Sequence, residues 1–212
     1  MSKLFESYWL GCMSYEEGLS LQEKLVAQKI AGDQKNYLLF LEHEPVYTMG
    51  RTPDVSSLGT RALPYPVHRT GRGGQATYHG PGQLVCYPIL DLSLFQRDLH
   101  IYLRFLEEVI IQTLAQYQIE AQRREGLTGV WVEDRKIASL GIGVRKWIAF
   151  HGLALNVSCD LSPFEEITPC GINGVTMTSL EKEAQRLNTD FIAPSLEEVA
   201  ERLEAGLKKH RE

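Results

Sequence analysis

Cys170 is the residue of this sequence whose surroundings best suit a chemical role. It lies in the run Thr-Pro-Cys-Gly at 168–171, between a proline and a glycine and outside any helix or strand periodicity. A cysteine on such a turn can present its sulfur to a cleft, where the thiolate is a strong nucleophile. The alternative is a turn cysteine that packs as a small apolar side chain, as we expect for Cys86 within the apolar run 84–90.

Lys136 is the second candidate, because it opens the segment Lys-Ile-Ala-Ser-Leu-Gly-Ile-Gly at 136–143. Strand alternation predicts that Lys136 shares a face with Ala138 and Leu140, so that its ammonium lies over a partly apolar surface. An ammonium close to a thiol favours the thiolate, which is otherwise a minor species at neutral pH. The alternative is a solvated lysine at the end of a strand.

A glycine-rich stretch at residues 70–83 is the third feature, with five glycines among fourteen residues. Glycine lets bare backbone come close to a ligand and lets the chain adopt positive φ. Together with the polar and aromatic side chains of this stretch, that property indicates a binding loop more than a plain turn. Small residues on the later strands would leave room for a ligand, although close strand packing also explains them: Ser139, Gly141, Gly143, Gly152 and Ala154.

The elements that must position these residues are a mixture of helices and strands. Apolar residues three and four apart predict an amphipathic helix over 93–118, and Ser-x-x-Glu capping boxes predict helix starts at Ser14 and Ser195. Short apolar runs between turn residues predict strands at 37–43, 66–70, 83–90, 127–132, 136–144 and 147–157. A further helix is expected at 179–185, and a single helical turn is expected at 162–165. The predicted architecture is one α/β domain with mixed sheets over residues 1–212.

Composition excludes several classes of protein. The chain has 212 residues, of which 43% are hydrophobic and 23% charged, as is ordinary for a globular protein. Its net charge of −5 argues against a dedicated nucleic-acid binder. The sequence shows neither a signal-peptide core nor an apolar run of membrane-spanning length. The four cysteines lack the paired spacing of zinc ligands, so we expect a cytoplasmic protein with reduced thiols and no metal.

Four blocks of sequence together resemble one family. They read Arg-Gly-Gly-Gln-Ala-Thr-Tyr-His-Gly-Pro-Gly-Gln at 72–83, Lys-Ile-Ala-Ser-Leu-Gly at 136–141, His-Gly-Leu-Ala-Leu-Asn-Val at 151–157 and Pro-Cys-Gly at 169–171. In this order they resemble the bacterial-type lipoyl (octanoyl) transferases, the octanoyl-acyl-carrier-protein:protein N-octanoyltransferases. The runs at 42–50 and 175–180 fit as well, so the match covers roughly residues 5–180.

The resemblance implies a fold shared with biotin- and lipoate-protein ligases, with a larger mixed sheet flanked by helices and a smaller sheet beside it. It implies an acyltransferase without a cofactor, which moves an octanoyl group from octanoyl-acyl carrier protein to a lysine of a lipoyl domain. The implied acceptors are the lipoyl domains of 2-oxo acid dehydrogenases and the glycine cleavage H protein. Cys170 matches the residue that carries the acyl thioester, and Lys136 matches the lysine that tunes or deprotonates it. The matching substrate-pocket residues are Arg72, Gly73, Gly74, Gln75, Ala76, Thr77, Tyr78, His79, Ser139, Leu140, Gly141, Gly152, Leu153 and Ala154.

Three other functions are weighed against the transferase. An ATP-dependent lipoate or biotin ligase would share the fold, the glycine-rich loop and a lysine like Lys136, but it needs no acyl-accepting cysteine. A cysteine hydrolase would pair Cys170 with His79 or His151, although isolated histidines more often orient loops by hydrogen bonding. A non-catalytic module that binds acyl groups or lipoyl domains would show no turnover.

The mouth of the glycine-rich loop is the expected docking surface for an acidic partner. Residues 45–90 contain four arginines, Arg51, Arg61, Arg69 and Arg72, against the single acidic residue Asp54. Because the chain as a whole is acidic, attraction of an acidic carrier or lipoyl domain would need such a local basic surface.

Overall fold

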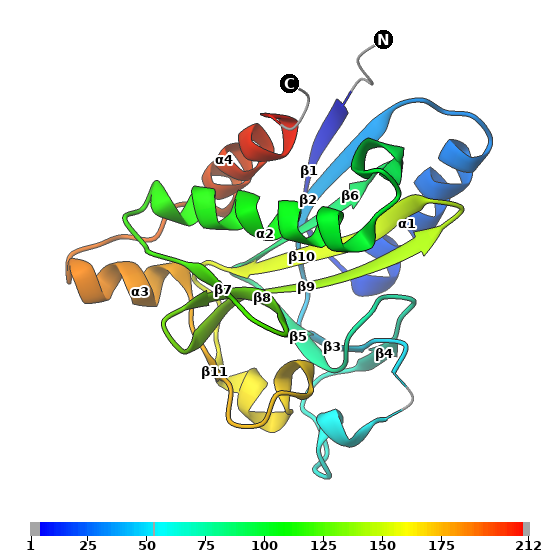
Figure 1. Cartoon of the computed structure of the whole chain (residues 1–212). Coiled ribbons are helices and arrows are strands. Elements are labelled where there is room, and N and C mark those ends of the chain that lie inside the picture. The colour runs from blue at the N-terminus through cyan, green and yellow to red at the C-terminus, as the bar shows by residue number, and fades with distance from the viewer. Residues whose placement is uncertain (1–4, 53, 210–212) are drawn as a thin grey trace.

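The computed structural model describes residues 5–52 and 54–209 and contains two sheets of unequal size (Figure 1). The larger sheet is mixed and follows the order β1-β2-β6-β10-β9-β8-β7, with β11 paired to β9, and the smaller sheet follows the order β4-β3-β5. The strands are β1 (Phe5–Met13), β2 (Asn36–His43), β3 (Val46–Met49), β4 (Val67–Arg69), β5 (Thr77–His79), β6 (Gln83–Ile89), β7 (Gln122–Arg124), β8 (Leu127–Val132), β9 (Arg135–Arg145), β10 (Ile148–Asn156) and β11 (Thr176–Met177). The predicted pair of a larger mixed sheet and a smaller sheet is confirmed.

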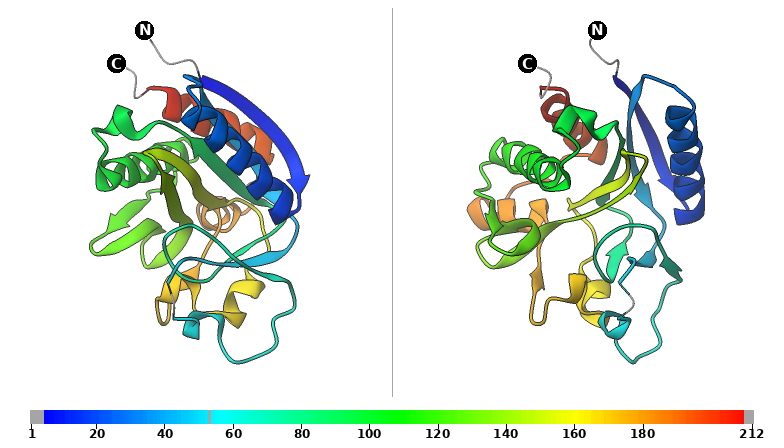
Figure 2. Two further views of the ribbon diagram at one scale, coloured as in Figure 1. Left: turned by 90° about the vertical axis from the view of Figure 1, so that its right-hand side faces the viewer. Right: turned by 45° about the vertical axis from the view of Figure 1, so that its right-hand side comes forward.

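Helices cover both faces of the larger sheet, as Figure 2 shows from two further sides. α1 (Tyr15–Ile30) packs on one face against β6 and β10, while α2 (Leu99–Ala115) and α4 (Leu196–Lys209) pack against each other on the opposite face. α3 (Leu180–Leu187) follows β11, and four short 3-10 turns connect other elements: η1 (Ser56–Leu58), η2 (Leu92–Phe95), η3 (Ser162–Glu166) and η4 (Pro169–Gly171). Within the described ranges, no helix has the length and apolar character needed to cross a bilayer.

The central strands are buried on both sides because helices cover each face. Every residue of β6 and of β10 is buried. Alternate residues of β6 enter different cores: Leu84 packs with α2 and α4, whereas Val85 and Tyr87 pack on the α1 side. A strand buried on both faces is mostly apolar, which explains the continuous apolar runs in the sequence.

The start of α1 confirms its predicted capping box, but the predicted start of α2 is wrong. Ser14 Oγ accepts from Glu17 N at 3.3 Å, and the Glu17 carboxylate accepts from Ser14 N at 3.0 Å. Residues 92–95 instead form the separate turn η2, and Asp98 caps α2. Gln96 and Arg97, between them, have left-handed backbones with φ of 55° and 57°, which ends the helical path that the apolar spacing predicts.

The smaller sheet has a core of its own. Tyr47, Met49 and Tyr78 from its strands pack with Phe164 of η3. The Tyr47 hydroxyl also donates to the Pro163 carbonyl at 3.0 Å. These contacts join the glycine-rich loop to the segment that leads to Cys170, although the two are far apart in the sequence.

Candidate active site

Cys170 lies on the turn η4, and its sulfur faces β9. The Cys170 Sγ atom is 3.1 Å from Lys136 Nζ and 3.9 Å from Ser139 Oγ. The Cys170 N–H donates to the Ala76 carbonyl at 2.8 Å, which docks the turn on the glycine-rich loop. Its backbone is left-handed, with φ of 57° and ψ of 15°, a strained state that clusters at functional sites. The structure therefore brings together the two residues that the sequence proposes for chemistry.

Lys136 is fully buried. Besides its contact with Cys170, Nζ donates to the Thr128 carbonyl at 3.0 Å and lies 5.4 Å from the centre of the Trp131 ring. A buried ammonium is costly unless polar or aromatic partners compensate for its lost water. The alternative of a solvated lysine at a strand end is therefore wrong.

A β-bulge decides which way Lys136 points. Opposite β8, the pairing of β9 skips Ile137, so Lys136 and Ala138 do not alternate regularly. The prediction that Lys136 shares a face with Ala138 is wrong for this reason. Ala138 packs in the apolar core, whereas the side chains of Lys136 and Ser139 both reach Cys170.

Two glycines leave room for side chains at the site, Gly129 for Lys136 and Gly171 for Gln75. Gly129 has φ of 135°, and a Cβ there would lie 2.6 Å from Lys136 Cε. Gly171 has φ of 69°, and a Cβ there would lie 2.2 Å from Gln75 Oε1. A side chain at either position would be strained and would displace a neighbour at the site.

A cavity of about 240 Å³ lies beside Cys170. Its floor crosses three neighbouring strands, at Gly141 of β9, Gly152 of β10 and Val85 of β6. Glycine is needed at 152, because a Cβ would lie 2.3 Å from the Cys86 carbonyl oxygen. The predicted pocket residues that line this cavity are Arg72, Gly74, Gln75, Thr77, His79, Ser139, Leu140, Gly141, Gly152, Leu153 and Ala154.

Gly73, Ala76 and Tyr78, predicted in the same set, do not line the cavity. The Gly73 N–H donates to the Ile142 carbonyl at 2.9 Å, and Ala76 is fully buried. Tyr78 packs in the core of the smaller sheet. These residues shape the loop and attach it to the rest of the fold.

Arg72 braces the glycine-rich loop from inside. Its Nη2 donates to the Thr48 carbonyl and hydroxyl at 2.7 and 2.8 Å and to the Gln75 carbonyl at 2.9 Å, while Nη1 donates to the Gly73 carbonyl at 2.9 Å. Burial lowers the pKa of its guanidinium, and the nearby Cys170 opposes this shift. The prediction that Arg72 belongs to an exposed basic surface is therefore wrong.

Several residues of the cavity wall do not follow from the sequence pattern. Tyr15 and Tyr87 line it, as does His151, which the sequence offered only as a partner of Cys170 or an orienting residue. Tyr87 could have been found, because it shares a face of β6 with Val85. Tyr15 could not, since its place depends on how α1 packs. The other missed residues are Val85, Gly126, Leu127, Thr128 and Ile172.

His79 and His151 do not pair with Cys170: within the described part of the chain, neither forms a hydrogen bond to its sulfur. His79 is hydrogen-bonded to Gln83 Oε1 at 2.7 Å and to Thr48 Oγ1 at 3.3 Å. Burial, helped by nearby positive charge, lowers the pKa of each histidine to about 3. Both are neutral at physiological pH, and the cysteine–histidine pair of the hydrolase alternative is not formed.

We expect acid to destabilise the protein through these two histidines. Because the folded-state pKa values of His79 and His151 are lowered to about 3, the unfolded chain binds more protons below its ordinary histidine pKa of about 6.5. The stability gained by keeping them neutral is present above that value and is lost as the pH falls toward 3. Going from pH 7 to pH 5 should reduce the free energy of unfolding by about 2 kcal/mol for each histidine.

Urea denaturation at the two pH values measures this loss. The free energy of unfolding should fall by about 2 kcal/mol less between pH 7 and pH 5 in His79→Gln than in the wild type. The same substitution at the exposed His100 should leave the difference unchanged. Equal pH dependence in the two variants would contradict the assignment.

Comparison with known proteins finds one matching family model and curated relatives that share a single name. Residues 14–208 match the family model of the lipoyl protein ligase A/B catalytic domain. A curated octanoyltransferase of Geobacter sulfurreducens is 51% identical over 180 residues, covering 85% of this chain and 76% of the relative. A curated octanoyltransferase of Citrifermentans bemidjiense is 48% identical over 202 residues, covering 95% of this chain and 96% of the relative.

Solved structures share the fold at low sequence identity. A putative lipoate protein ligase from T. acidophilum with bound lipoic acid superposes with a TM-score of 0.71 at 19% identity, over 99% of this chain and 86% of the other. The biotin protein ligase of Aquifex aeolicus superposes with a TM-score of 0.53 at 14% identity, over 98% of this chain and 69% of the other. The predicted fold, similar to that of lipoate and biotin ligases, is confirmed.

Proposed function

The chain belongs to the octanoyltransferases, within the lipoyl protein ligase A/B catalytic-domain family, and we propose that it transfers the octanoyl group through a thioester on Cys170. It is an acyltransferase. The proposed donor is octanoyl-acyl carrier protein, and the proposed acceptor is a lysine of a lipoyl domain. The observation that carries the proposal is the 3.1 Å contact between Lys136 Nζ and Cys170 Sγ.

In the first half of the proposed reaction, the Cys170 sulfur attacks the carbonyl carbon of the carrier's thioester. Lys136 stabilises the thiolate, because its ammonium is buried and donates to the sulfur. A new carbon–sulfur bond forms to Cys170, and the carbon–sulfur bond to the carrier breaks. The carrier's thiolate leaves and takes up the proton that the cysteine lost.

In the second half, the neutral amine of the acceptor lysine attacks the acyl-enzyme carbonyl. A carbon–nitrogen bond forms, the bond to Cys170 breaks, and the amine's proton returns to the Lys136–Cys170 pair. An amide is more stable than a thioester, so this step drives the transfer without ATP. No other cofactor is needed for this balance of bonds and protons.

The cavity suits the acyl chain of this reaction. It runs from Cys170 across β9 and β10 to β6, and two strand spacings amount to about 10 Å. An extended octanoyl chain is of comparable length. The small residues Gly141 and Gly152 leave the backbone floor flat beneath such a chain.

The deciding experiment is a turnover assay with octanoyl carrier protein and apo-lipoyl domain in the absence of ATP. Octanoylation of the lipoyl-domain lysine is the expected result. A strict need for ATP with release of pyrophosphate would favour the ligase alternative. Release of free octanoate would favour a hydrolase, and binding without turnover would favour a non-catalytic module.

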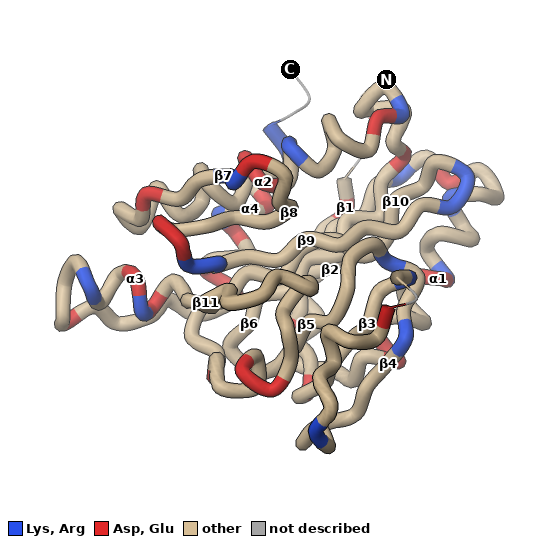
Figure 3. Tube along the Cα trace, turned by 60° about the horizontal axis from the view of Figure 1, so that its bottom comes forward, with Lys and Arg blue, Asp and Glu red and all other residues tan. Residues whose placement is uncertain are grey.

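Arg51 is the arginine that we propose to attract an acidic donor. It is exposed, its N–H donates to the Arg72 carbonyl at 3.0 Å, and its charge reaches His151 in the cavity wall. Figure 3 shows further basic positions beside β3 and β4. Arg61, by contrast, lies out in the loop between β3 and β4, 4.0 Å from Glu166.

Arg51→Glu should raise the apparent KM for the carrier by about fivefold and reduce its dependence on salt, because long-range attraction speeds encounter. Arg61→Glu is the control, since it makes the same charge change beside Glu166, at an arginine whose charge does not act on His151, and it should have the smaller effect. KM measured over a salt series tests both. Equal effects of the two reversals would remove Arg51 from the docking surface.

A further inference from the structure

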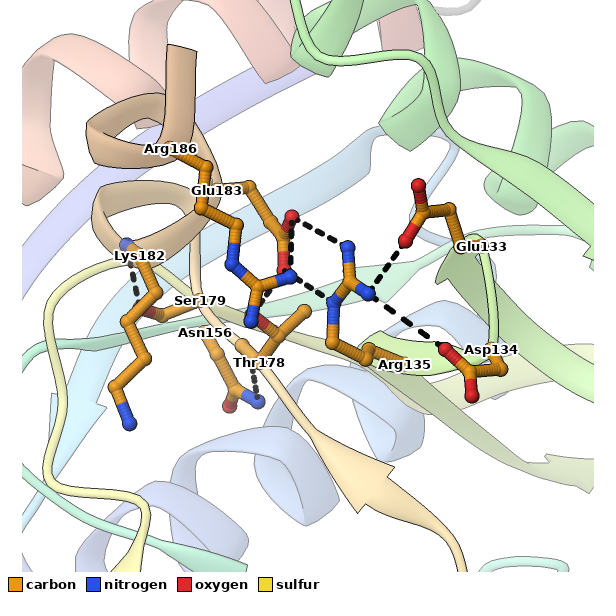
Figure 4. Close-up of polar contacts among 9 residues, drawn as sticks. All are labelled: Glu133, Asp134, Arg135, Asn156, Thr178, Ser179, Lys182, Glu183 and Arg186. Carbon is orange, nitrogen blue, oxygen red and sulfur yellow. Dashed lines mark hydrogen bonds and ion pairs between the residues drawn. The ribbon is translucent and has the colours of Figure 1, made fainter. Parts of the chain in front are cut away.

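Arg135, the residue before Lys136, belongs to an ion-pair cluster with Glu183 of α3 (Figure 4). The Glu183 carboxylate is 4% exposed and accepts two hydrogen bonds from Arg135, from Nε at 2.8 Å and from Nη2 at 2.9 Å. Thr178 Oγ1 donates to the same carboxylate, and Arg186 Nη1 lies 3.3 Å from it. Burial alone would raise the pKa of Glu183, but the bonds from Arg135 and Thr178 lower it, so Glu183 is charged.

Thr178 connects this cluster to the backbone of Lys136. The Thr178 N–H donates to the Lys136 carbonyl at 2.9 Å, and the preceding strand β11 pairs in parallel with Arg135 and Lys136. Asn156 Nδ2 donates to the Thr178 carbonyl at 2.9 Å. Because β11 follows the turn with Cys170 closely in sequence, the cluster fixes the far end of the segment that carries the nucleophile.

From these contacts we infer that Glu183 and Arg135 are positioning residues, whose ion pair clamps the segment after Cys170 onto the strand of Lys136. The inference rests on the proposed function, because it takes Cys170 as the nucleophile and Lys136 as its partner. The two-pronged geometry of an arginine–carboxylate pair fixes direction as well as distance. A pair of reacting groups that is misplaced by about 1 Å loses much of its rate.

The charges that face Cys170 make the effect of the clamp measurable. Lys136 faces the thiol from β9, and Arg72 interacts with it from the glycine-rich loop. Arg72 is held by Thr48 and Gln75, outside the cluster. Loosening the clamp should therefore weaken the stabilisation of the Cys170 thiolate by Lys136 and leave the interaction of Arg72 with Cys170 unchanged.

Three variants test the clamp in different ways. Glu183→Gln keeps the size of the side chain but removes the charge and one of the two acceptors. Arg135→Lys keeps the charge but cannot form the two-pronged pair. Thr178→Val removes one hydroxyl of a buried residue and leaves no charge unpaired, so it keeps the test decisive if a charge variant does not fold.

Two readouts separate positioning from general stability. Alkylation of Cys170 by iodoacetamide should shift upward by about one pH unit in Glu183→Gln and Arg135→Lys, because the ammonium stabilises the thiolate less. Acyl-enzyme formation from octanoyl carrier should slow about tenfold, with KM for the carrier unchanged. Thr178→Val should change both readouts in the same direction by a smaller factor.

Glu133→Gln and Arg186→Gln are matched controls. Glu133 contacts Arg135, and Arg186 contacts Glu183, but their side chains are 74% and 52% exposed. Both controls should behave as the wild type. Folded clamp variants with an unchanged alkylation profile and acylation rate would overturn the inference.

A different result would overturn the proposed function itself. If Cys170 of the wild type is alkylated no faster than the exposed Cys12, the Lys136–Cys170 chemistry fails, whatever the clamp variants do. If Cys170 of the wild type is alkylated faster than Cys12, but the clamp variants are alkylated and acylated like the wild type, only the clamp is rejected.

Discussion

Cys170→Ala should abolish octanoyl transfer, with turnover falling by at least about a thousandfold, because removing a nucleophile leaves only binding and orientation. Octanoyl carrier alone should leave an octanoyl adduct on the wild-type enzyme, since the amine of the second step is missing. The adduct should be cleaved by hydroxylamine, map to Cys170, and be discharged by apo-lipoyl domain without ATP. Intact-mass measurement follows each of these steps.

The remaining cysteines serve as internal controls. Burial raises the pKa of Cys86 well above its ordinary value and that of Cys159 to about 12. Cys12 is exposed, but partial desolvation and the nearby carboxylates of Glu42 and Glu44 raise its pKa as well. Cys12→Ala should therefore change little, while Cys86→Ala should cost about 1 kcal/mol of stability and leave the chemistry intact.

Normal transfer by Cys170→Ala would reject the proposed mechanism. An acyl-adenylate in place of the thioester would do the same and would favour the ATP-dependent ligase.

Lys136→Ala should slow acyl-enzyme formation by about a hundredfold or more, the usual contribution of a group that exchanges a proton with the reacting atoms. It should also move the alkylation profile of Cys170 to higher pH. The sign follows from the geometry: an ammonium 3.1 Å from the sulfur favours the thiolate, and without it a higher pH is needed to form the same fraction. Stopped-flow acylation and alkylation rates over a pH series measure the two effects.

Lys136→Met separates charge from packing. Alanine at this fully buried position would leave a void beside Trp131, whereas methionine fills similar space without charge. Both variants should show the same kinetic loss, and methionine should lose less stability. Unchanged acylation and an unchanged alkylation profile in the methionine variant would return Lys136 to a structural role.

Most of the larger elements follow from local pattern. The capping box at Ser14, the apolar runs of β2, β6 and β10, and the hairpin strands β8 to β10 lie where the sequence predicts them. The longest exception is β1 (Phe5–Met13), which the sequence pattern does not predict and none of whose nine residues is fully buried, so it lacks the apolar run of the central strands. The other exceptions are short or irregular. β11 has two residues and β7 has three, too few for periodicity to be visible, and η2 interrupts an apolar spacing that looks like a continuing helix.

The candidate site divides in the same way. The turn that carries Cys170 is one continuous stretch of sequence, and so is the glycine-rich loop. The composition of each stretch therefore reveals it. Tyr15 escapes notice because it reaches the cavity only through the packing of α1. Arg72 has the composition of a surface residue, but the loop folds its backbone carbonyls around the guanidinium.

By itself, the sequence determined the local features: a cysteine on a kinked turn, a lysine at the start of a strand, and a loop able to bring its backbone close to a ligand. These depend on neighbours along the chain. Only the tertiary structure decided that Lys136 turns toward Cys170 and that Glu183 holds the strand beside it. The first depends on a bulge that shifts the strand by one residue. Both depend on contacts between distant parts of the chain, because Lys136 and Cys170 are separated by 34 positions and Arg135 and Glu183 by 48. Local propensity does not specify such contacts.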